Sequence, residues 1–138
     1  MAAFNKINSF VEAVAEKTHN LGSDALVLAL TASANAPVNT NTQLTNLTQI
    51  SYTNLSSRAI TTSSSSQTSG TYKLVLADVV LTASGGAVAA FRYVVIYNDT
   101  ATNDELIGWY DYGSDLTLQN GESLTVDFDG TNGVLQIA

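Results

Sequence analysis

The chain contains one histidine and no cysteine, which restricts the chemistry that its side chains could perform. A nucleophilic triad would have to use His19, but the sequence has no Gly-x-Ser-x-Gly segment to present a serine on a strand-to-helix turn. A zinc site would have only carboxylates to add to His19. We therefore predict that the protein is not an enzyme, and that His19 is a solvated residue at the end of a helix.

Carboxylates are grouped in two polar segments. Asp99, Asp104 and Glu105 share one segment, and residues 127–133 carry oxygen ligands at alternate positions, as calcium loops do. A complete calcium loop also needs a third carboxylate, a correctly placed glycine and a distant bidentate glutamate, which this segment lacks. The sequence thus favours ordinary turns in both places, and it predicts no metal and no cofactor.

Aromatic side chains gather in two neighbouring predicted strands, as Tyr93, Tyr97, Trp109, Tyr110 and Tyr112. Strand alternation places Trp109 on the face opposite to Tyr110 and Tyr112. Packing within the sheet is the simplest use of these rings. Exposed rings could instead stack on sugars, as in β-sandwich carbohydrate-binding modules, or form a protein interface, so Trp109, Tyr110 and Tyr112 are candidate interface residues.

The N-terminal segment has the periodicity of an amphipathic helix over about residues 4–17. Apolar residues recur at spacings of three and four, at Phe4, Ile7, Phe10, Val11 and Val14. Ser9 and Glu12 match a capping box, but Ser9 lies inside the apolar stripe, so we predict a start between residues 2 and 5. The stripe packs on the chain's own sheet or docks onto another subunit, which makes Phe4, Ile7 and Phe10 further candidate interface residues.

The elements that must position these residues are mostly strands. Residues 25–30 are apolar on both faces, as expected of a central strand. Residues 35–70 form a flexible polar region, with weak strands at 49–53 and 58–62 and a serine-rich stretch at 63–70 that is expected to be a mobile tip.

The β-rich part of the chain is predicted to run over residues 72–138. Its strands 72–81 and 88–98 are expected to form a hairpin, and Asn120-Gly121 is expected to make another tight hairpin turn. The predicted fold is mainly β, an antiparallel β-sandwich or barrel with one N-terminal amphipathic helix, in a single domain over residues 1–138.

Composition excludes several partner classes. The 138 residues include five Lys+Arg and twelve Asp+Glu, a net charge of -7, whereas nucleic-acid binding needs a basic face. No apolar run approaches the ~20 residues of a membrane span. We therefore predict no nucleic-acid and no membrane partner.

Three segments, residues 4–22, 92–100 and 106–113, together resemble small virion proteins of tailed bacteriophages. Capsid decoration (cement) proteins are the best-fitting class. The resemblance implies a protein made in the host cytoplasm that binds major capsid protein on the phage head surface, often as a trimer, with no cofactor and no reaction. A tail or neck component of the virion and a carbohydrate-binding module are the alternatives.

Overall fold

The computed structural model describes residues 2–138, and the elements in this range are short strands with little helix. The strands are β1 (Asn5–Lys6), β2 (Leu26–Thr31), β3 (Ala59–Ile60), β4 (Thr62–Thr68), β5 (Thr71–Leu76), β6 (Val79–Thr82), β7 (Phe91–Asn98), β8 (Leu106–Leu116), β9 (Ser123–Val126) and β10 (Leu135–Ile137). The helices are α1 (Phe10–Ala15) and the 3-10 turns η1 (Ser33–Asn35) and η2 (Leu44–Asn46).

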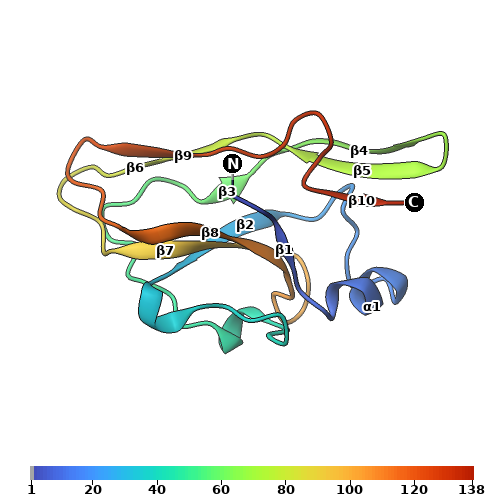
Figure 1. Ribbon diagram of the computed structural model, residues 1–138, viewed down its shortest axis with the longest axis horizontal. Coiled ribbons are helices and arrows are strands. Elements are labelled where there is room, and N and C mark those ends of the chain that lie inside the picture. Colours follow the sequence, from blue (N-terminus) through green and yellow to red (C-terminus); the bar gives the residue numbers. More distant parts are fainter. Residues whose placement is uncertain (1) are drawn as a thin grey trace.

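The strands form two layers (Figure 1). One layer is a five-stranded sheet in the order β1-β8-β7-β2-β3, and the other combines the sheet β10-β5-β4 with the pair β6-β9. Every pairing is antiparallel. The predicted mainly β, antiparallel fold with one N-terminal helix is confirmed, and within residues 2–138 no sheet closes into a barrel.

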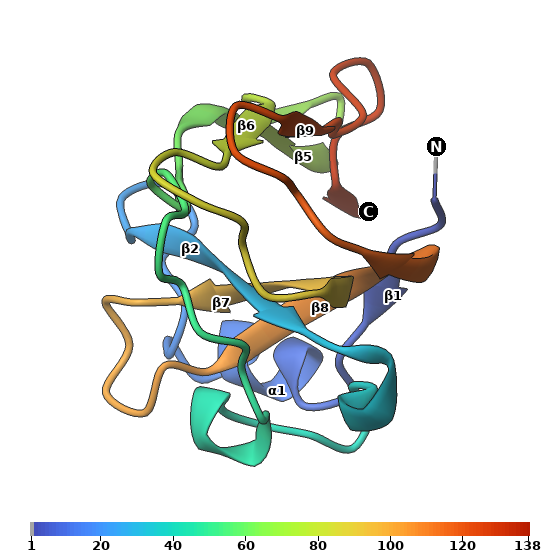
Figure 2. The same cartoon turned by 90° about the vertical axis from the view of Figure 1, so that its left-hand side faces the viewer.

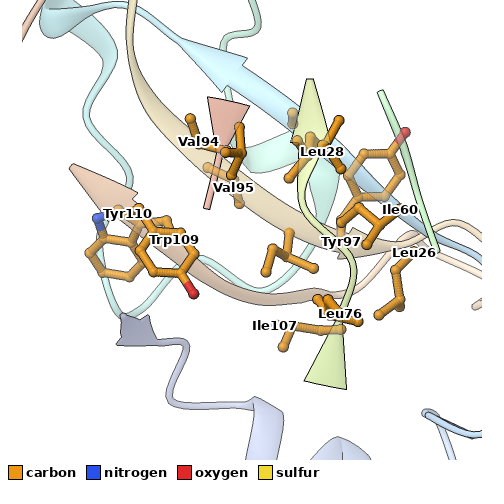
Figure 3. Packing of buried hydrophobic residues seen from close by; sticks show 14 of the residues in the cluster. Leu26, Leu28, Ile60, Leu76, Val94, Val95, Tyr97, Ile107, Trp109 and Tyr110 are labelled. Carbon is orange, nitrogen blue, oxygen red and sulfur yellow. The ribbon is translucent and has the colours of Figure 1, made fainter. Parts of the chain in front are cut away.

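The five-stranded sheet is covered on both faces. Figure 2 shows the second layer on one side of it and α1 with the 3-10 turns on the other. Strand β2 is therefore buried at every position except Val27, which confirms the predicted central strand. The hydrophobic core includes Leu28, Val95 and Ile107, which are fully buried side chains of the five-stranded sheet (Figure 3).

The N-terminal helix is shorter than predicted, and its predicted start between residues 2 and 5 is wrong. Ser9 is the N-cap of α1, and Asn5–Lys6 before it form strand β1. Strand β1 pairs with β8, where Lys6 lies opposite Gly108. The ring of Phe4 can pack against Gly108 because glycine has no side chain, and a side chain at that position would overlap the ring. Phe4 is thus partly buried and Ile7 fully buried beside the β1–β8 pairing, which helical periodicity alone does not reveal.

The predicted hairpin between residues 72–81 and 88–98 is also wrong. Strand β6 pairs with β9, while β7 pairs with β2 and β8. Residues 83–90 and 117–122 instead run side by side from one layer to the other, joined by Ala83 N to Glu122 O at 2.9 Å and by Val88 N to Leu118 O at 2.9 Å. The Asn120-Gly121 turn therefore belongs to a crossover between sheets.

The serine-rich stretch that was expected to be a mobile tip forms strand β4. It pairs with β5 through a two-residue turn in which Ser69 (φ 52°) and Gly70 (φ 84°) both have positive φ. Positive φ at both central residues is the geometry of a type I′ turn, which matches the twist of a hairpin. Of the two weak strands, only the second forms, as β3, and residues 49–53 remain irregular.

Candidate functional site

The apolar residues of the N-terminal candidate interface are used by the chain itself. Ile7 and Phe10 are buried in the core, and Phe4 is partly buried with its ring 5.5 Å from the ring of Tyr110. The core therefore uses the side chains of Ile7 and Phe10, which corrects the interface prediction for these two residues, whereas Phe4 is covered only in part.

The aromatic candidate interface is largely inside the sandwich as well. Trp109 and Tyr110 are buried, and alternation along β8 places them on opposite faces of that strand, while Tyr112 is exposed. The Tyr110 ring lies 6.1 Å from the ring of Phe128, and burial raises the pKa of its hydroxyl to about 12, with a smaller contribution from Asp129. Trp109 and Tyr110 are therefore packed in the core, whereas Tyr112 alone of these three candidates keeps its ring exposed.

His19 is buried, not solvated as predicted, with only 6% of its surface exposed. Its Nδ1 lies 2.9 Å from Nδ2 of Asn98. The Asn98 amide is fixed in orientation, because its Oδ1 accepts from the N–H groups of Thr100 and Ala101 and its Nδ2 donates to Asp24 at 2.7 Å. Nδ1 of His19 must then accept a hydrogen bond, so the ring is neutral and carries its proton on Nε2.

The environment of His19 favours this neutral form. Burial lowers the pKa of the imidazole from its ordinary value of 6.5, and the nearby carboxylates of Glu105 and Asp24 oppose this only in part. Nε2 has no hydrogen-bond partner among the residues that the structure describes. The cluster ties the segment after α1 to the loop after β7, and its position shows a structural role for His19.

Acidification should destabilise the fold through His19. Because the pKa is lower in the folded chain, the two states bind protons equally well above pH 6.5, and the unfolded state binds more protons from about pH 6.5 down to the lower pKa of the folded chain. The free energy of unfolding should therefore fall as pH drops from 7 to 5. Urea unfolding would measure this, with His19→Gln as the control, since a glutamine oxygen can still accept from Asn98 but does not titrate.

His19 is the only histidine, so its NMR titration can be assigned without ambiguity. A pKa at or above 6.5 in the folded protein would contradict this account. An equal loss of stability on acidification in the His19→Gln variant would contradict it as well.

A hollow of about 590 Å³ opens beside this cluster. One wall is the end of α1 and the segment after it, including Val14, Leu21 and His19, and the other includes Tyr72 and Ile137. The second wall belongs to the three-stranded sheet β10-β5-β4, which we call the overhang because it extends beyond the five-stranded sheet (Figure 1). Ile137 is 43% exposed there, so the hollow offers apolar surface to a partner.

The outer strand of the overhang has a free edge. Thr68 and Thr71 flank the two-residue turn and form a hydrogen-bonded pair, so Thr68, Ser66 and Ser64 direct their backbone groups toward β5. Ser65 and Gln67 direct theirs away from it. Apart from the hairpin itself, residues 62–70 make no backbone–backbone hydrogen bond within residues 2–138.

The carboxylate segments form turns. Oδ1 of Asp129 accepts from the N–H groups of Thr131 at 2.9 Å and Asn132 at 2.8 Å, a local Asx turn. No group of three or more metal-ligating side chains occurs in residues 2–138. The hollow and the free edge of β4 are therefore the features that best suit binding. The sequence signal for the β4–β5 hairpin was Gly70, a turn residue that directly precedes an apolar strand.

No protein-family model, no curated protein and no solved structure matches this chain. None of the helices in residues 2–138 is long and apolar enough to cross a membrane.

Proposed function

We propose that this protein is a non-enzymatic structural protein of a bacteriophage virion, which binds major capsid protein on the outside of the head and stabilises the shell. The observation that carries the proposal is the overhang, which offers apolar surface at the hollow, where Ile137 is exposed. The single histidine is occupied in a structural cluster. The three segments resemble small virion proteins of tailed bacteriophages, among which decoration proteins are the best-fitting class, and this resemblance supports the capsid as the partner.

Such a protein acts by mass action. A protein that binds the assembled shell more tightly than separate capsid subunits stabilises the shell by the free energy of that binding. Repetition of the lattice lets a small contact on each copy act many times. A modest surface such as the overhang is therefore sufficient for this role.

Addition of the purified protein to bare heads tests the proposal. We expect saturable binding in a fixed ratio to capsid protein and a higher temperature of head disruption. Failure to bind heads would overturn the proposal. In that case, binding to isolated tails or necks would place the protein elsewhere in the virion.

A pair of matched substitutions tests the surface. Ile137→Thr in the hollow should weaken binding to heads about fivefold, because burying the rest of a half-exposed isoleucine contributes about 1 kcal/mol. Val80→Thr is the control, since Val80 is 53% exposed but lies on β6, outside the overhang. Titration of labelled protein onto heads would measure both. Equal affinities for the two variants would show that the hollow does not face the capsid.

A further inference from the structure

The edge of β4 lacks the features that normally keep sheet edges apart. Natural edge strands are shortened, or carry lysine, proline or inward-facing charge. Strand β4 has seven residues, Thr-Ser-Ser-Ser-Ser-Gln-Thr, none of which is charged or proline. Its one irregularity is a register shift between Thr62 and Ser64, which leaves residues 64–68 as a regular edge.

We propose that this edge pairs, antiparallel, with the β4 edge of a second copy of the chain, in a register centred on Ser66. The inference does not depend on the proposed function. Ser66 then faces Ser66 of the second copy, Ser65 faces Gln67, and Ser64 faces Thr68. Both strands use the whole regular edge, and every facing pair consists of small or amide side chains that tolerate close approach.

The backbone groups fit this register. Ser65 and Gln67 are the residues whose N–H and C=O groups point away from β5. In the proposed register they become the hydrogen-bonded pairs, and Ser66 becomes the closer, non-hydrogen-bonded pair. Two such pairs exchange about four hydrogen bonds, which satisfies the outward groups of the regular edge. If one strand were shifted by one residue, the outward backbone groups of Ser65 and Gln67 would face residues whose N–H and C=O groups point toward β5. These hydrogen bonds would then be lost.

Charge favours a second copy at this edge over other parts of the surface. The chain carries a net charge of -7, so two copies repel each other at acidic surfaces. No charged residue occurs between Arg58 and Lys73 in the sequence. Lys73 extends toward the carbonyl of Thr131, on the β10 side of the hairpin and away from the free edge. The copies can therefore approach at β4 without like charges in contact.

The resulting contact is two-fold and joins the two overhangs into a six-stranded sheet. Figure 1 shows the β4–β5 hairpin reaching past the other strands, and residues 66–70 of this hairpin are exposed. Two strands alone bury less than the ~1,200 Å² of a standard interface, so we expect a weak dimer, with dissociation in the micromolar range or above. A two-fold pair differs from the trimer that the resemblance implies.

Cysteine cross-linking tests the register, because the chain has no other cysteine. Ser66 is exposed on the outer face, so Ser66→Cys should fold normally. In the proposed register the two introduced cysteines have Cα atoms about 4.5 Å apart, which allows a disulfide. Thr68→Cys is the matched control, since its two copies would lie four residues, or about 13 Å, apart along the strands.

We expect oxidation to convert most of the Ser66→Cys protein to a covalent dimer at ~100 μM, at least tenfold faster than the Thr68→Cys protein. A mixture of Ser64→Cys and Thr68→Cys proteins should give the mixed dimer, because these positions face each other. Sedimentation velocity of the unmodified protein should show dimerisation that depends on concentration. The proposal is overturned if the unmodified protein stays monomeric to ~1 mM, or if Ser66→Cys and Thr68→Cys cross-link at equal rates.

Discussion

Gly108→Ala is expected to destabilise the protein by about 3 kcal/mol, at the upper end of the usual cost of overpacking. A Cβ atom at this position would overlap the ring of Phe4 and lie 2.6 Å from the carbonyl oxygen of Asn5. The backbone cannot move aside freely, because Lys6 of β1 pairs directly with Gly108. The substitution should therefore detach β1 from the edge of the five-stranded sheet, at a cost that is large beside a total stability of about 5–15 kcal/mol.

Urea denaturation would measure this change in the free energy of unfolding. Gly130→Ala is the control, since a Cβ there meets no atom within 4 Å and the backbone has no positive φ, so its effect should stay within about 0.5 kcal/mol. The double variant Phe4→Ala/Gly108→Ala should lose less than the sum of the two single losses, because the first change removes one source of overlap. Equal stability of the Gly108→Ala and Gly130→Ala proteins would refute the close packing of Phe4 on β8.

The largest loss is expected from Phe91→Ala, at about 3–5 kcal/mol. Phe91 is 0% exposed and is among the largest fully buried side chains in residues 2–138. It lies where the crossover of residues 83–90 enters β7, opposite Leu116 of β8. Its truncation leaves a cavity at the point where the two layers are joined, and the surrounding strands cannot all collapse into it.

Chemical denaturation of the Phe91→Ala protein and of two control variants, Phe91→Leu and Tyr112→Ala, would measure this loss of stability. Phe91→Leu keeps most of the volume and should lose less than about 1.5 kcal/mol. Tyr112→Ala removes an exposed aromatic ring from the neighbouring strand and should change stability by about 0.5 kcal/mol or less. A loss below about 1.5 kcal/mol for Phe91→Ala would show that this residue does not anchor the layers.

The strands with strong local signals were predictable from the sequence. Both faces of β2 are covered, and a strand of this kind is apolar at consecutive positions. The continuous apolar run at residues 25–30 therefore predicted a central strand correctly. The aromatic residues of β7 and β8 were likewise placed in neighbouring strands, and Val95 does pair with Trp109. The sequence pattern predicted a strand correctly where the residues of that strand are enough to decide whether its faces are buried.

Features that depend on distant residues were not predictable in this way. Phe4 and Ile7 have helical spacing, but the room at Gly108 makes an extended segment more favourable. His19 is buried because Asn98, far along the chain, holds its ring. The serine-rich stretch has too little apolar character to signal order by itself, and its strand forms because β5 supplies the partner.

The pairing of β2 with β7 also has a consequence during synthesis on the ribosome. Leu26 to Thr31 pair with Asn98 to Tyr93, so the most apolar strand leaves the ribosome long before its main partner exists. At about 5–20 residues per second, the intervening residues take several seconds to translate. During that time β2 is an exposed apolar segment that can associate with other nascent chains, so lower growth temperature or added chaperone should raise the yield of soluble protein.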